Sequence, residues 1–131
     1  MPHISIEYSR NLDQRLDMPG FLRALRDAAV ETGVFPPAGI RVRAFAADHV
    51  CIADGQPDHG FIDISVRLRG GRSDADKSRS TAHIFAAAEA FCAADMEKNS
   101  LMLSLEMRDI NPDLSPKTSS IRRFLPEDMQ R

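Results

Sequence analysis

The chain has 131 residues, a formal net charge of −2 and 43% hydrophobic residues, as expected for one domain with an ordinary core. A slightly acidic chain has no basic field to attract nucleic acid, and no apolar run approaches the roughly 20 residues that cross a membrane. The amino end shows no secretory signal, and two cysteines, Cys51 and Cys92, are more typical of lone thiols in a reducing cytosol than of a bridge. We therefore expect a cytoplasmic single-domain protein with neither a nucleic-acid nor a membrane partner.

Proline directly follows the initiator methionine in the opening segment Met1-Pro2-His3-Ile4. A small residue at position 2 favours removal of Met1, which leaves Pro2 as a free secondary amine. An α-amino group has a pKa of about 7.7–8.0, and burial or a nearby cation lowers it further because both disfavour the protonated form. The alternative is that Pro2 only starts a strand, a common role for a residue without an N–H.

Alternation of apolar and polar residues with a period of two predicts four strands. They cover about residues 3–8, 40–45, 62–69 and 101–107. The same alternation places Pro2 on the face of Ile4, and it gives each strand one apolar and one largely polar face.

Two helices are predicted between these strands, over about Pro19–Thr32 and Asp74–Lys98. Asp17 or Met18 caps the first helix, and Ser73 followed by Asp76 forms a capping-box pattern before the second. The order strand, helix, strand occurs twice, so each half is a β-α-β unit with parallel strands.

We therefore expect an α/β (α+β) fold with a tandem β-α-β repeat, a four-stranded mixed sheet and both helices on one face. The single domain spans residues 1–131, with pseudo-repeats of about 1–58 and 59–110 and a tail over 111–131. An Asp54-Gly55 turn predicts a short hairpin arm between the second and third strands. The tail is expected to wrap over the surface or a neighbour, with a short turn near 121–125.

The opposite side of the sheet is expected to be wet or buried against partner subunits. It carries these polar residues: Ser5, Glu7, Arg41, Arg43, Ser65, Arg67, Ser104 and Glu106. Phe45 and Met102 on the same side favour a partner.

Two arginines are candidates for holding an anion. Gly70-Gly71-Arg72-Ser73 joins a strand to a helix, where free backbone N–H groups and the two-pronged Arg72 guanidinium could bind a carboxylate. The alternative is a capped turn with a solvated arginine. Arg41 begins a strand parallel to the first, so it lies at the same sheet edge as Pro2. It could lower the pKa of the Pro2 amine, or it could be the outward half of an alternating strand, as could Arg43.

No metal or organic cofactor is expected. The four histidines and Cys51 match no common zinc spacing, the cysteines have no adjacent base, and nucleotide-binding glycine motifs are missing from the sequence.

Six short segments occur in a specific order and spacing: Met1-Pro2-His3, Thr32-Gly33-Val34-Phe35-Pro36, Ala38-Gly39-Ile40-Arg41, Ala53-Asp54-Gly55-Gln56, Gly70-Gly71-Arg72-Ser73 and Asn111-Pro112-Asp113-Leu114 with Lys117. With these markers, almost the whole chain resembles the 5-carboxymethyl-2-hydroxymuconate Δ-isomerase family of the tautomerase superfamily.

The resemblance implies an isomerase of aromatic-compound catabolism that shifts a proton in a 2-hydroxymuconate-type dienol acid without a cofactor. It implies Pro2 as the base, Arg41 and Arg72 as catalytic substrate-carboxylate contacts, and Phe35 as a further substrate-binding residue. It also implies a homotrimer in which the uncovered sheet faces pack together around a central channel.

Three features depart from the family pattern and leave the exact substrate open: His59 in place of a larger aromatic, Val42 between two arginines, and the extended tail 125–128. A non-enzymatic binding or regulatory protein on the same scaffold is the alternative function. An RNA-binding module is disfavoured, because the strands lack aromatic pairs for base stacking.

Overall fold

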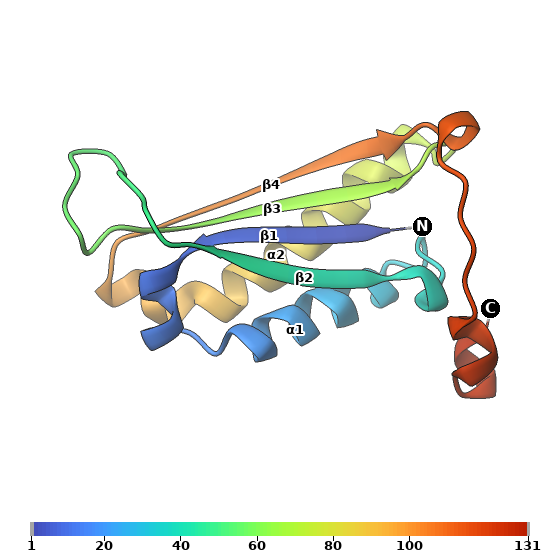
Figure 1. The fold of residues 1–131 in the computed structure, drawn as a ribbon, viewed down its shortest axis with the longest axis horizontal. Coiled ribbons are helices and arrows are strands. Elements are labelled where there is room, and N and C mark those ends of the chain that lie inside the picture. The colour runs from blue at the N-terminus through green and yellow to red at the C-terminus, as the bar shows by residue number, and fades with distance from the viewer. Residues whose placement is uncertain (1, 131) are drawn as a thin grey trace.

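A four-stranded sheet with two helices packed on one face forms the core (Figure 1). The computed structural model describes residues 2–130. The elements are β1 (His3–Ser9), α1 (Met18–Glu31), β2 (Arg41–Ala47), β3 (Gly60–Arg69), α2 (Asp74–Lys98) and β4 (Leu101–Ile110). The strand order is β2-β1-β3-β4, with β1 parallel to β2, β3 parallel to β4, and the central β1–β3 pair antiparallel. The predicted mixed sheet and both β-α-β units are confirmed.

Both helices begin at the caps that the sequence predicts. The Asp17 carboxylate accepts a hydrogen bond from the Gly20 N–H at 3.1 Å, and the Ser73 hydroxyl accepts one from the Asp76 N–H at 3.1 Å. These side chains satisfy N–H groups that have no partner inside the first helical turn. The observed starts therefore follow directly from local sequence chemistry.

The core lies between the sheet and the two helices. Ile4, Ile6, Ile62, Ile64 and Val66 point from the two central strands into it with no exposed surface. The helices contribute a second set of fully buried side chains: Phe21, Leu25, Ile84 and Cys92. Alternation with a period of two thus separates a dry face from a polar one, as predicted. No helix in the described part of the chain has the length and apolar composition needed to cross a membrane.

Short 3-10 helices complete the chain: η1 (Arg10–Gln14), η2 (Pro37–Gly39), η3 (Pro112–Leu114), η4 (Ile121–Phe124) and η5 (Glu127–Met129). The last three lie on the tail. After β4 the tail runs across the end of the sheet at which β1 begins (Figure 1). The predicted turn near residues 121–125 corresponds to η4.

The predicted hairpin arm is present as a protruding loop over residues 48–59, but its two limbs do not pair as strands. The loop joins β2 to β3, and β1 lies between these two strands, so the connection must cross the end of β1. Its tip is a turn closed by the Gly55 N–H bonding to the Ile52 carbonyl at 2.8 Å, with Gly55 at φ +87°. The Asp54-Gly55 turn was therefore predicted correctly, whereas the hairpin around it was wrong.

A buried ion pair fastens the loop after β1 to the end of α2. Arg15 Nη2 and Nε contact the two Asp95 carboxylate oxygens at 2.5 and 3.0 Å, and the Asp95 side chain is only 5% exposed. Arg15 also donates to the Ser100 carbonyl at 3.1 Å and the Asp58 carbonyl at 3.2 Å. The hydrogen bond from Arg15 is the main cause that lowers the pKa of Asp95. One guanidinium therefore joins η1, the arm and the α2–β4 turn.

Replacing Asp95 by alanine should lower the free energy of unfolding by about 3 kcal/mol, because it leaves the Arg15 charge buried without its partner. Urea unfolding followed by circular dichroism measures the change. Asp27→Ala is the matched control, since it removes the carboxylate of an exposed Arg26–Asp27 pair and should change stability by less than about 1 kcal/mol. Equal effects of the two substitutions would contradict the bracing role of Arg15.

Candidate functional site

Pro2 lies at the tip of a central strand. It immediately precedes β1, and its side chain is among the fully buried ones, on the core side with Ile4. Its carbonyl accepts a hydrogen bond from the Arg41 N–H at 3.2 Å, which extends the β1–β2 pairing by one residue. A proline fits here because a residue ahead of the strand has no ladder N–H to supply.

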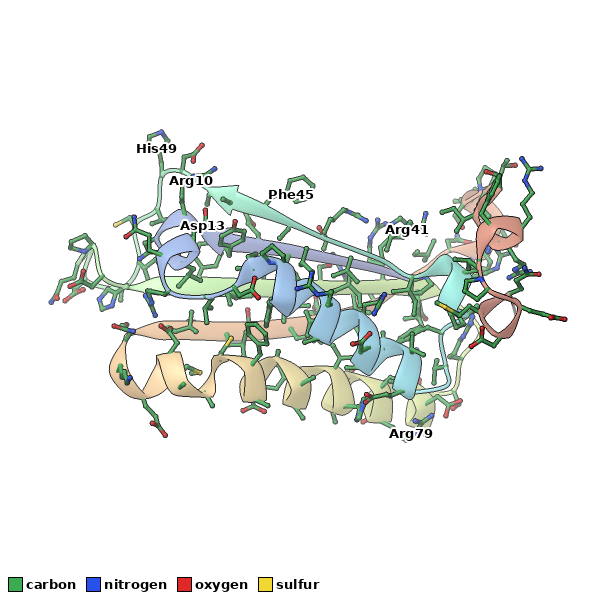
Figure 2. The ribbon with its side chains drawn as sticks, turned by 90° about the horizontal axis from the view of Figure 1, so that it is seen from below. Arg10, Asp13, Arg41, Phe45, His49 and Arg79 are labelled. Carbon is green, nitrogen blue, oxygen red and sulfur yellow. The ribbon has the colours of Figure 1, made fainter. Side chains whose placement is uncertain are left out.

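The Arg41 side chain lies on the other face of the sheet. Its Nη2 contacts His3 Nε2 at 3.0 Å, and Arg43 Nη1 contacts His3 Nδ1 at 3.1 Å. The predicted sheet edge therefore brings Arg41 next to Pro2 through the backbone, while its guanidinium binds the neighbouring histidine. Figure 2 shows Arg41 at the end of the molecule where the tail lies.

His3 is a member of this site that the sequence analysis missed. Its pKa is lowered to about 4, first by burial and then by the positive charges of Arg41, Arg67 and Arg43. The imidazole is therefore neutral near pH 7 and can accept a hydrogen bond from an arginine. The cross-strand register that pairs His3 with Arg41 and Arg67 was the missing signal.

Arg72 and Phe35 lie on two loops that contact each other near the start of β1. The Arg72 guanidinium donates to the Val34 carbonyl and the Arg69 carbonyl, each at 3.3 Å, and no carboxylate among residues 2–130 pairs with it. Phe35 is 3% exposed and borders a shallow pocket of about 200 Å³ formed by residues 33–37. Gly71 at φ +114° provides the predicted sharp turn before Arg72. The loop after α1 and the loop after β3 thus meet beside the start of β1.

A second pocket, of about 310 Å³, lies between η2 and the tail. Its floor comes from Pro36, the Ala38–Gly39 turn and Arg41, and its other wall is tail segment 117–122. Lys117 and Arg122 were not predicted as site residues, since only the path of the tail brings them to Arg41.

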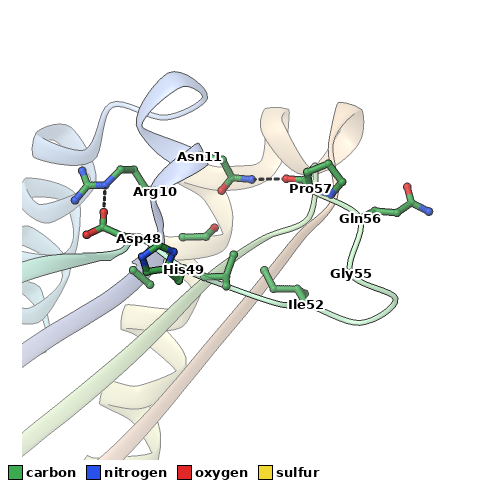
Figure 3. A pocket seen from close by; sticks show the side chains of 11 residues that line it. Arg10, Asn11, Asp48, His49, Ile52, Gly55, Gln56 and Pro57 are labelled. Atoms are coloured by element: carbon green, nitrogen blue, oxygen red, sulfur yellow. Dashed lines mark hydrogen bonds and ion pairs between the residues drawn. The ribbon is translucent and has the colours of Figure 1, made fainter.

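Another pocket, of about 380 Å³, lies at the opposite end of β1, between η1 and the arm (Figure 3). Its polar groups largely bind one another: Arg10 Nε contacts Asp48 at 2.5 Å, and the Asn11 amide donates to the Pro57 carbonyl at 3.3 Å. Because its charges are already paired, this pocket is a weaker candidate for an anionic ligand than the one beside Arg41.

His59, which departs from the family pattern, helps to close the arm. Its Nε2 lies 2.7 Å from Asp54 Oδ1, and its Nδ1 lies 2.7 Å from Ser100 Oγ. The hydrogen bond from His59 is the first cause of the lowered pKa of Asp54. The histidine thus ties the arm to the α2–β4 turn, far from Pro2 along β1. Residues 2–130 contain no group of three His, Cys, Asp or Glu side chains placed to hold a metal ion.

Comparison with known proteins agrees with the resemblance seen in the sequence. A model of the 5-carboxymethyl-2-hydroxymuconate isomerase family matches residues 2–125. The 5-carboxymethyl-2-hydroxymuconate Delta-isomerase of Escherichia coli is 32% identical over 121 residues, which are 92% of this chain and 96% of that protein.

Solved structures support the same assignment. A crystal structure of a 5-carboxymethyl-2-hydroxymuconate delta-isomerase superposes with a TM-score of 0.88 at 32% identity, covering 95% of this chain and 92% of that one. A 5-carboxymethyl-2-hydroxymuconate isomerase from Deinococcus radiodurans R1 gives 0.86 at 28% identity, with 95% of both chains covered. A fused 4-OT symmetric trimer shares the fold at 21% identity and a TM-score of 0.60, covering 83% of this chain and 85% of that one.

Arg41→Met should raise the pKa of His3 above about 4, because it removes the largest charge that opposes protonation of the imidazole. The pKa should stay below the ordinary value of about 6.5, since burial persists. Titration of the His3 ring by NMR measures both values. Arg26→Met removes an exposed, distant arginine and should leave the pKa of His3 unchanged; a wild-type His3 that titrates near 6.5 would contradict a pKa lowered by burial and neighbouring arginines.

Proposed function

Because the chain belongs to the 5-carboxymethyl-2-hydroxymuconate isomerase family, we propose that it isomerises a 2-hydroxymuconate-type dienol acid, with Pro2 as the group that carries the proton. The Escherichia coli relative is named for 5-carboxymethyl-2-hydroxymuconate, and that acid is our first choice of substrate. The observation that supports this best is the position of Pro2 directly before a central strand, beside Arg41 at the start of β2 and near Arg72 on the loop after β3.

The reaction that we propose is a proton shift without net change in composition. After removal of Met1, the neutral Pro2 nitrogen takes the proton of the substrate's 2-hydroxyl. The oxygen electron pair forms a carbonyl, the conjugated double bonds shift by one position, and the prolinium returns a proton to a carbon further along the diene. A base for this step works best when its pKa lies near the working pH.

Three features of the site support this role for Pro2. Pro2 is buried, and burial disfavours a charged amine. The cations of the adjacent loops and strands disfavour the charged amine as well. The same cations stabilise the negative charge that develops on the substrate oxygen during the transfer. Arg72 is the best placed of them to hold a carboxylate, because only backbone carbonyls occupy its guanidinium among the described residues.

We also propose that the protein works as a homotrimer packed through the uncovered sheet face. Phe45 is 59% and Met102 67% exposed on that face, which is more than a solvated sheet needs. The fused 4-OT structure, which has the same fold, is described as a symmetric trimer.

Pro2→Ala should reduce kcat for the dienol acid by about 10²-fold or more, in the range that a positioned proton-transfer group contributes. Alanine keeps a free amine but loses the ring that fixes its position, so folding should persist. Turnover is followed by ultraviolet absorbance, and circular dichroism checks the fold. Mass spectrometry must show that Met1 is absent from the active protein, and full activity in Pro2→Ala would exclude the proposed role.

Met102→Glu should dissociate the trimer, because a buried unpaired carboxylate is costly. Sedimentation should then give a mass near that of one 14.5 kDa chain in place of three. Met96→Glu is the control, since Met96 is 43% exposed but lies on α2, on the helical side. A wild-type protein that sediments as a monomer would refute the trimer.

A further inference from the structure

We infer that Lys117 and Arg122 of the tail form, with Arg41, a binding site for a second carboxylate of the substrate, the one remote from its 2-hydroxyl group. The inference rests on the proposed function, because it names where another part of the same substrate binds. It is based on the pocket of about 310 Å³ between η2 and the tail.

The lining of this pocket has an unbalanced charge. Lys117, Arg122 and Arg41 all border it, and its lining includes no aspartate or glutamate. No carboxylate within residues 2–130 forms an ion pair with Lys117 or Arg122. Three cations around one small pocket repel one another, and an anion bound between them removes that repulsion.

Some cations elsewhere in the protein are paired with carboxylates. Lys77 lies 3.5 Å from Asp74 and 3.4 Å from Asp109, and Arg79 lies 3.2 Å from Asp76. Lys77, Asp74 and Asp109 border another pocket, of about 570 Å³, in which the one cation of the lining is thus already paired. The tail pocket differs because three cations border it and no carboxylate of its lining pairs with them, in a chain whose overall charge is negative.

The remaining lining suits the rest of a dienol acid. Pro36 and Ile121 provide apolar surface for a hydrocarbon chain, and Thr118 and Ser119 provide hydroxyl groups that can donate to a carboxylate. Ser119 Oγ accepts the Ile121 N–H at 3.2 Å, which leaves its own hydrogen available. At about 310 Å³ the pocket is at the small end of ligand sites.

Arg41 connects this pocket to the proton-transfer site. Arg41 borders the pocket, its guanidinium contacts His3 at 3.0 Å, and its N–H bonds to the Pro2 carbonyl at 3.2 Å. A substrate with carboxylates at both ends of its diene can therefore place one end among the tail cations and its reacting carbons toward Pro2. The tail then selects substrates by charge, and it takes no part in the proton transfer.

The test compares 2-hydroxymuconate with 2-hydroxy-2,4-pentadienoate, which lacks the remote carboxylate. We expect Lys117→Gln and Arg122→Gln each to raise KM for 2-hydroxymuconate about tenfold with little change in kcat, and to leave KM for 2-hydroxy-2,4-pentadienoate unchanged. Arg123→Gln is the matched control. It removes the same charge from the next residue, whose guanidinium lies 5.0 Å from the Phe124 ring and does not border the pocket.

Two results would overturn the inference: unchanged KM in both tail variants, or an equal rise in Arg123→Gln, which would indicate only a general field. Either result leaves the proposed function intact if wild type is active and Pro2→Ala is not.

If wild type isomerises neither acid, the proposed function fails. Binding of adipate and hexanoate, measured by calorimetry, then decides the inference: adipate must bind wild type at least about tenfold more tightly than hexanoate, and this preference must disappear in Arg122→Gln.

Discussion

Pairing of β1 on both of its edges is the constraint on which the rest of the structure depends. β1 bonds in parallel to β2 and antiparallel to β3, so the amino end of the chain begins in the middle of the sheet. Position 2 therefore cannot move freely as most chain ends do. The hydrogen bond from the Arg41 N–H to the Pro2 carbonyl extends the β1–β2 pairing to Pro2. In the reaction that we propose, the amine that removal of Met1 leaves on Pro2 is held in this way beside the surrounding loops.

The same register arranges charge on the uncovered face. His3 lies opposite Arg41 and Arg67, and Arg67 lies opposite Arg108, so one row across the sheet is strongly basic. Two rows further along β1, Glu7 lies opposite Asp63. Like charges that face one another across strands are unfavourable in an isolated sheet.

A neutral His3 separates Arg41 from Arg67, which relieves part of this repulsion without adding a negative charge. In the trimer that we propose, the basic and acidic rows lie where neighbouring copies meet, so each row can face groups of the opposite sign. The basic row also keeps positive charge at the end of the sheet where Pro2 lies.

Local patterns predicted most of the fold and only part of the candidate site. The alternation in β3 and the cap residues Asp17 and Ser73 each act over a few residues, and the observed elements follow them. The hairpin in the arm was wrong because whether two limbs pair depends on the strand order, and β1 separates β2 from β3. Lys117 and the altered pKa of His3 depend on contacts between residues far apart in sequence, which no local pattern contains.

The surroundings of β1 differ at its two ends in how their charges are compensated, and this difference supports the site that we propose. At the arm end, Arg15 is paired with Asp95, Arg10 with Asp48, and His59 contacts Asp54. These contacts satisfy the charged groups and hold the loops in place, so an anion arriving there would have to displace a carboxylate. Beside Pro2, by contrast, Arg72 donates to backbone carbonyls, Arg41 contacts a neutral imidazole, and Lys117 and Arg122 form no ion pair with a carboxylate of residues 2–130. An anionic substrate gains the full interaction with such groups, because no carboxylate of residues 2–130 competes for them. The fold therefore places paired charges around the arm at one end of β1 and unpaired cations beside Pro2 at the other, and the second end is where we propose that a dienol acid binds.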